Sequence, residues 1–192
     1  MTDTSQSKLY TIVVFSEHHV GLLNQLSIIF TRRGLNIESI TASLSSRPDV
    51  HKITITCRSN AEMMDKVLKQ IEKRIDVIRA MVYTDDDLVY QEVALCKIST
   101  RPFVNDRRNE EVIRRHAARI LSLTPDYTVI EKTGHIDEIQ ALFAELQSYD
   151  VKQFVRSGRV AIVKSAIEHV DEFLRRRDAD FTNLDNKTET SC

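Results

Sequence analysis

The sequence has few of the residues that build several common kinds of functional site. It contains only four glycines, three prolines and no tryptophan, which leaves little room for glycine-rich phosphate-binding loops. Its cysteines are odd in number, far apart and in no Cys-x-x-Cys arrangement, which disfavours a disulfide scaffold or a cysteine-rich zinc site; they are Cys57, Cys96 and Cys192. No apolar run approaches the ~18 residues of a membrane-spanning helix, and the N-terminus lacks the apolar segment of a signal peptide. We therefore expect a cytoplasmic protein that makes no membrane contact.

The charge and the absence of known catalytic motifs disfavour further classes. Lys and Arg total 27 and Asp and Glu total 28, so the net charge of −1 argues against bulk electrostatic binding to nucleic acid, although it leaves a local basic patch open. The sequence contains no nucleophile elbow, P-loop, His-Glu-x-x-His or Gly-x-Gly-x-x-Gly motif. No catalytic residues are therefore predicted, and no metal site or cofactor in this chain.

Residues 9–84 show the pattern of a β-α-β-β-α-β unit. Gly34 is typical of the left-handed residue that follows a helix, and Asn60 suits a helix N-cap. Apolar residues repeat at helical spacing in two segments and in strand-like runs in four others. The predicted helices cover 21–33 and 63–71, and the predicted strands cover 9–15, 36–44, 50–58 and 76–83. This order is typical of the ferredoxin-like fold, an antiparallel sheet with both helices on one face.

The same order returns after the acidic run at 85–87. Predicted helices cover 106–119 and 136–146, and predicted strands cover 90–98, 121–123, 127–131, 151–155 and 160–163. We therefore predict an α+β protein with two ferredoxin-like βαββαβ domains, at 9–84 and 90–165, joined by a linker at 85–89. Residues 1–8 are predicted to be a disordered N-terminus. Residues 166–192 are predicted to begin as a helix and to continue as a polar tail.

The turn between the first strand and the first helix is the main candidate site. It contains His18, His19, Val20, Gly21 and Leu22. A helix N-terminus has unpaired N–H groups and a positive partial charge. Because Gly21 has no side chain to block close approach, such a turn can hold a small carboxylate. The alternative is that Gly21 serves only packing.

The adjacent histidines and a basic segment raise other possibilities. His18 and His19 suggest a metal site, but no Cys, Asp or Glu stands at a ligand spacing, which favours solvated or interface histidines. His116 lies on the apolar face of the predicted helix 106–119, which favours a buried, hydrogen-bonded histidine. The arginines of that helix raise an RNA-recognition domain, but the exposed face of strand 50–58 lacks the aromatic residues that stack on bases. A solvated or partner-binding basic face is favoured.

One segment is more specific than these patterns. Gly21-Leu22-Leu23 is followed by Phe30-Thr31-Arg32-Arg33-Gly34-Leu35-Asn36-Ile37-Glu38-Ser39-Ile40. It resembles the ACT domain of acetolactate synthase (acetohydroxyacid synthase) small subunits, in which a Gly-Leu helix start is followed by Phe-x-x-Arg-Gly-x-Asn-Ile-x-Ser-Ile/Leu. Residues 92–98 and 155–161 resemble strands and turns of that family's second domain. The resemblance spans residues 9–164.

The resemblance implies a non-catalytic regulatory subunit in branched-chain amino acid biosynthesis. The reaction would belong to a separate large subunit that carries thiamine diphosphate, magnesium and FAD. The small subunit would activate that large subunit and transmit feedback inhibition by valine. The alternative function is a free-standing ACT-domain amino-acid sensor that regulates another enzyme or transcription.

The resemblance also implies where an effector would bind. ACT domains of this family pair into homodimers, and valine or another branched-chain amino acid lies at that interface. Gly21 and Leu22 match the family's ligand-binding turn, and Asn36 and Ile37 match the segment that faces it. His18 stands where family members often have Asn, and Val20 where a small polar residue is common. The expected effector-binding residues are His18, His19, Val20, Gly21, Leu22, Asn36 and Ile37.

Overall fold

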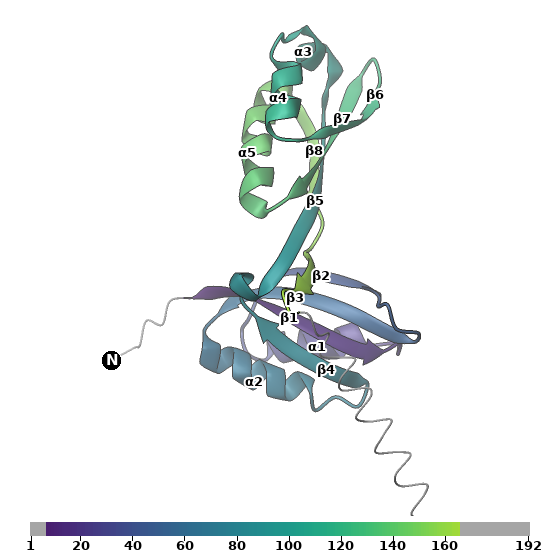
Figure 1. Ribbon diagram of the computed structural model, residues 1–192, viewed down its shortest axis with the longest axis vertical. Coiled ribbons are helices and arrows are strands. Elements are labelled where there is room, and N and C mark those ends of the chain that lie inside the picture. The colour runs from purple at the N-terminus through teal and green to yellow at the C-terminus, as the bar shows by residue number, and fades with distance from the viewer. Residues whose placement is uncertain (1–6, 166–192) are drawn as a thin grey trace, which may run out of the picture. The chain divides into compact units, whose positions relative to one another are not determined.

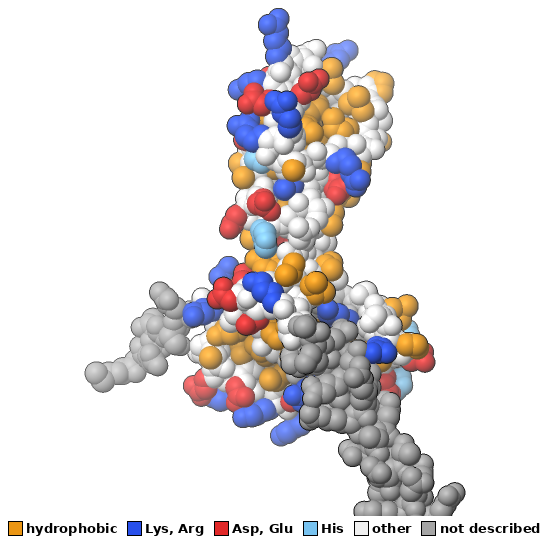
Figure 2. Space-filling model, in the orientation of Figure 1, with side chains coloured by type: hydrophobic (Ala, Val, Ile, Leu, Met, Phe, Trp, Pro, Cys, Tyr) orange, Lys and Arg blue, Asp and Glu red, His pale blue; other side chains and the backbone are white. Residues whose placement is uncertain are grey.

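The computed structural model describes residues 7–165, which divide into two compact units. Among these residues, the first unit contains 7–89 and 162–165, and the second contains 90–161. Each unit has one antiparallel sheet with its helices packed on one face (Figure 1). On the face of the molecule shown in Figure 2, acidic and basic side chains are interspersed, in keeping with the net charge of −1. Within residues 7–165, no helix combines the length and the apolar composition needed to cross a membrane.

The first unit has the predicted β-α-β-β-α-β order. Its strands are hydrogen-bonded in the order β2-β3-β1-β4, and every neighbouring pair is antiparallel. The elements are β1 (Lys8–Glu17), α1 (Leu22–Thr31), β2 (Ile37–Leu44), β3 (Val50–Ser59), α2 (Ala61–Ile71) and β4 (Val77–Tyr83). The ferredoxin-like, ACT-type fold predicted for this part of the chain is confirmed.

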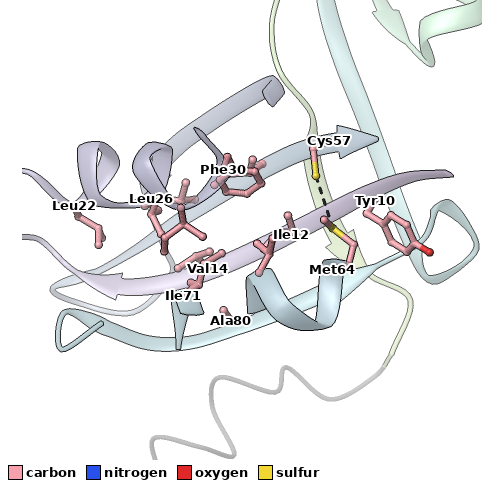
Figure 3. Close-up of a cluster of buried hydrophobic side chains, with 14 residues drawn as sticks. Tyr10, Ile12, Val14, Leu22, Leu26, Phe30, Cys57, Met64, Ile71 and Ala80 are labelled. Carbon is pink, nitrogen blue, oxygen red and sulfur yellow. Dashed lines mark hydrogen bonds between the residues drawn. The ribbon is translucent and has the colours of Figure 1, made fainter. Parts of the chain in front are cut away.

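The core of the first unit lies between the sheet and the two helices. Alternate residues of β1 point to this side, because successive side chains of a strand face opposite ways. They meet one face of α1 and one face of α2 (Figure 3). Each of these side chains is less than a tenth exposed; they include Tyr10, Ile12, Val14, Leu22, Leu26, Phe30, Met64 and Ile71.

The ends of the two helices follow the predicted local chemistry. Gly34 has φ +64°, and the N–H of Leu35 donates to the Phe30 carbonyl at 3.0 Å, so the chain turns back after α1. At the start of α2, the Asn60 side chain accepts a hydrogen bond from the Met63 N–H at 2.8 Å. Both predictions about the helix ends are confirmed.

The second unit repeats the same order with a differently built first helix. Its sheet has the order β6-β7-β5-β8, and β9 pairs with β5. The segment predicted as a linker, 85–89, consists of the 3-10 turn η1 (Asp85–Asp87) and the first residues of β5. The elements are β5 (Leu88–Ser99), α3 (Thr100–Asn105), α4 (Asn109–Arg115), β6 (Arg119–Leu123), β7 (Tyr127–Gly134), α5 (Ile136–Leu146), η2 (Gln147–Tyr149), β8 (Val151–Arg156) and β9 (Val160–Val163). The second predicted ferredoxin-like, ACT-type fold is therefore confirmed.

The helix predicted at 106–119 is wrong in its extent. Asp106 is extended, and its carboxylate accepts hydrogen bonds from the Arg108 N–H at 2.9 Å and the Tyr149 hydroxyl at 2.8 Å. An Asp side chain that bonds nearby groups in this way competes with helix formation, so α3 ends before it and α4 begins after it. At the other end, Ala117 has φ +46°, and β6 begins two residues later.

His116 therefore follows α4 instead of lying within a helix. Its side chain is 12% exposed, and its Nε2 lies 3.0 Å from a carboxylate oxygen of Glu145. The predicted hydrogen-bond partner is confirmed, whereas His116 is partly buried and not a core residue. The predicted helix and tail at 166–192 lie outside the described residues, as does most of the predicted N-terminal segment 1–8; β1 begins at Lys8.

Candidate functional site

The turn predicted as a site joins the end of β1 to the start of α1. The N–H of Glu17 donates to the Asp76 carbonyl at 3.0 Å, and the N–H of His19 donates to the Glu17 carbonyl at 3.1 Å. Gly21 then precedes α1 with φ +91°, a conformation that side-chain-bearing residues rarely adopt. A Cβ placed on Gly21 would meet no atom within 4 Å. Gly21 is therefore needed for its backbone conformation and not for packing, and the space beside it is open.

The N-terminus of α1 has no acidic or capping side chain of its own. Gly21 offers no side-chain cap, and the first turn of α1 has no Asp or Glu. By contrast, α2 has Asn60 as its cap and Glu62 in its first turn, and α5 has two acidic residues there. The first N–H groups of a helix lack intrahelical partners and carry a positive partial charge. At α1 no side-chain cap or first-turn carboxylate offsets that charge.

Two histidine contacts hold this turn against the rest of the first unit. The ring of His18 stacks on the ring of His51 in β3, with centroids 4.0 Å apart and planes inclined by 6°. The Nδ1 atom of His19 lies 2.7 Å from a carboxylate oxygen of Asp76, in the turn that leads into β4. The hydrogen bond and the negative charge of Asp76 raise the pKa of His19. The turn is thus anchored on both sides.

Sequence reasoning did not single out His51 or Asp76. Their importance follows from the strand register, which pairs Ser16 with both His51 of β3 and Val77 of β4. No spacing in the linear sequence reveals this register. The position of His51 opposite the end of β1 becomes visible only when the two strands are aligned.

The other predicted site residues differ in what they can offer a ligand. Val20 is fully exposed, whereas Leu22 is 4% exposed and belongs to the core, so its backbone alone can face a ligand. Asn36 is exposed, and Ile37 packs against the core at the start of β2. These last two residues follow the end of α1, and Gly21 precedes its start. The structure therefore brings residues 18–22 together but leaves Asn36 and Ile37 at the other end of α1.

The rest of the described chain offers little other chemistry. Burial raises the pKa of both the Cys57 and Cys96 thiols to about 11, so neither is a ready nucleophile. Between residues 7 and 165, no three His, Cys, Asp or Glu side chains are grouped so that they could hold a metal ion. In the second unit, the buried Glu92 lies 2.9 Å from the guanidinium of Arg156, whose side chain is 31% exposed. We regard that pair as structural, because it ties β8 to β5.

Comparisons with known proteins give a consistent result for both units. Residues 12–79 match the family model described as the AHAS small subunit-like ACT domain, and residues 91–165 match the model described as the small subunit of acetolactate synthase. The chain is 32% identical over 157 residues to the "Probable acetolactate synthase small subunit" of Archaeoglobus fulgidus, covering 81% of this chain and 96% of that protein. It is 31% identical over 145 residues to the acetolactate synthase small subunit of Bacillus subtilis, covering 75% and 84%.

A solved structure shows the same fold. The crystal structure of the acetolactate synthase small subunit from Thermotoga maritima matches with a TM-score of 0.75 at 21% identity. The match covers 83% of this chain and 99% of that one.

The His19–Asp76 contact predicts a specific dependence of stability on pH. Because the pKa of His19 is raised on folding, the contact stabilises the protein fully below the unfolded pKa of about 6.5 and is lost as pH rises through the folded pKa. We expect His19→Gln to lower the thermal midpoint more at about pH 5.5 than at about pH 8.5. The same loss at both pH values would contradict this, and Asp76→Asn should remove the pH dependence without any change at His19.

Proposed function

Since the chain belongs to the family of acetolactate synthase small subunits, we propose that it regulates a separate, large catalytic subunit of acetolactate synthase. The observation that carries this proposal is that family models match both units. In addition, the chain aligns with most of the length of two acetolactate synthase small subunits. In this proposal the thiamine diphosphate, magnesium and FAD belong to the large subunit. The small subunit raises its activity and mediates feedback inhibition by valine.

The effector site that we propose uses the α1 N-terminus. The carboxylate of valine, or of another branched-chain amino acid, would accept hydrogen bonds from the first N–H groups of α1, beside Gly21. Two observations support this location: the helix end has no acidic or capping side chain, and the space at Gly21 is open. His18 and His19 would line the turn, and Val20 is fully exposed beside them.

The effector would bind between two protomers. Asn36 and Ile37 lie at the far end of α1, so they can reach this turn only from a second copy of the chain. The strand β2 lies at one edge of its sheet and exposes Ile40 and Leu44, which are 43% and 71% exposed. Exposed apolar residues on an edge strand favour pairing with another chain. We therefore place the homodimer contact at β2 and α1.

Regulation requires that the effector distinguish two states of the complex. A ligand that binds both states equally well shifts no equilibrium. An amino acid bound between protomers stabilises the paired arrangement that completes the site. The activity of the large subunit would then depend on whether its partner dimer is held in that arrangement.

A mixing experiment tests the regulatory role. The purified chain alone should form no acetolactate, and adding it to the large subunit should raise the rate of acetolactate formation. Valine should lower that gain. If the chain changes neither the rate nor the valine sensitivity, and captures no thiamine-dependent enzyme, the proposal is wrong and the free-standing sensor is favoured.

A substitution at Gly21 tests the effector site. Gly21→Asp should abolish valine binding in calorimetry, because it places a negative charge where the ligand carboxylate would lie. Gly21→Asn is the matched control, since it brings a side chain of similar size and the same backbone strain without the charge. It should retain more affinity than the Asp variant. If Gly21→Asp bound valine as tightly as the unsubstituted chain, the proposed location of the effector site would be wrong.

A further inference from the structure

The strand β6 is an edge strand that is almost unprotected. It pairs with β7 alone among the described strands. Three of its five residues are large and apolar, and Ile120, Leu121 and Leu123 are 42%, 49% and 60% exposed. Edge strands carry unpaired N–H and C=O groups, and proteins usually shield them with charges, proline or a covering element. The single charged residue of β6, Arg119, is already held by Glu131.

On the helix side of the sheet, the side chain of β7 at this point is buried, whereas that of its neighbour on β6 is exposed. Ile120 pairs with Ile130, so the two side chains lie on the same face. Ile130 is 1% exposed, whereas Ile120 is 42% exposed. Figure 1 shows β6 at the free edge of the sheet, away from α5.

Arginine residues are frequent in the segment that leads into this edge strand. Residues 100–121 contain six arginines and three acidic residues, in a chain whose net charge is −1. Arg101, Arg107 and Arg114 are exposed and have no carboxylate partner among the residues described. Figure 2 shows hydrophobic side chains gathered over β6 and β7, with Lys and Arg side chains nearby. We call β6 together with these three arginines the β6 edge.

The positive charge of the β6 edge favours an acidic partner over a second copy of this chain. Pairing with the β6 edge of a second copy would bring the arginines of both copies together, and like charges oppose such pairing. An acidic partner would be attracted instead. The backbone groups of β6 suit an extended segment, and the exposed isoleucine and leucines suit apolar side chains on it.

We propose that the β6 edge binds an extended segment of the large catalytic subunit that is both acidic and apolar, adding it as a strand beside β6. This inference rests on the proposed function, because it takes the large subunit as the partner. Backbone hydrogen bonds along β6 provide affinity. Ile120, Leu121 and Leu123 provide the apolar contact, and the three arginines select an acidic partner.

The test compares two substitutions at one exposed position. Leu121→Glu and Leu121→Lys both remove the apolar contact, but only the glutamate repels an acidic segment. We expect Leu121→Glu to weaken binding to the large subunit about tenfold or more, and Leu121→Lys to weaken it less. Binding is measured by biolayer interferometry with immobilised large subunit. Val155→Glu, on the opposite edge strand β8 and 47% exposed, is the matched control and should bind like the unsubstituted chain.

A second variant tests the charge alone. Arg114→Glu should weaken binding, and the difference from the unsubstituted chain should shrink at high salt. Valine binding to the same variants, measured by calorimetry, should be unchanged, since the effector site lies in the other unit.

Several results would overturn the inference. Unchanged affinity of Leu121→Glu and Arg114→Glu for the large subunit would do so while leaving the proposed function intact. The inference would also fail if these two variants dissociated the small-subunit dimer without altering affinity for the large subunit, because a second copy of the chain would then be the partner at the β6 edge. Salt-dependent RNA binding that Arg114→Glu abolishes, with large-subunit affinity unchanged, would point to nucleic acid instead. If the unsubstituted chain does not bind the large subunit at all, the proposed function itself fails.

Discussion

The first unit depends on a central strand, β1, that is buried on both faces. Ile12 and Val14 face the helices, while Val13 and Phe15 face the other side, and each is at most 2% exposed. Burying each such side chain contributes roughly 1.5–3 kcal/mol, and a one-residue slip would exchange the two faces. The register of β1 against β3 and β4 is therefore strongly specified. It determines where β1 ends, and hence where the turn at residues 18–21 meets His51 and Asp76.

The two units share one topology and differ in the helix that follows their first strand. In the first unit that helix is continuous, and its uncapped N-terminus follows an open glycine turn. In the second unit Asp106 divides it, and Ile120, Leu121 and Leu123 of the edge strand β6 are exposed. One arrangement suits a small anionic ligand and the other suits an extended protein segment. In our proposals, the first unit binds the effector and the second unit binds the large subunit, although both have the same fold.

Local chemistry made much of the fold predictable from the sequence. Strand alternation, helical spacing, Gly34 and Asn60 each act over a few residues, and in the first unit the structure agrees with all of them. The helix at 106–119 was predicted wrongly, because apolar spacing does not register the competing hydrogen bonds of Asp106 or the left-handed Ala117. The histidine contacts of the turn could not be predicted at all, since they join residues that are 33 and 57 positions apart in the chain. Sequence reasoning could name Gly21 and Asn36, but the fold alone reveals that they lie at opposite ends of α1.

That separation leads to the central claim, that one effector site is built from two protomers. Complementation of two inactive variants tests it most directly. Gly21→Asp and Asn36→Asp homodimers should each fail to bind valine. A mixed dimer should regain one site, because it joins the intact Gly21 turn of one protomer to the intact Asn36 of the other. Calorimetry on mixed dimers verified by native mass spectrometry should therefore show one valine bound per mixed dimer. Mixed dimers that bind no valine, while the unsubstituted dimer does, would contradict the account.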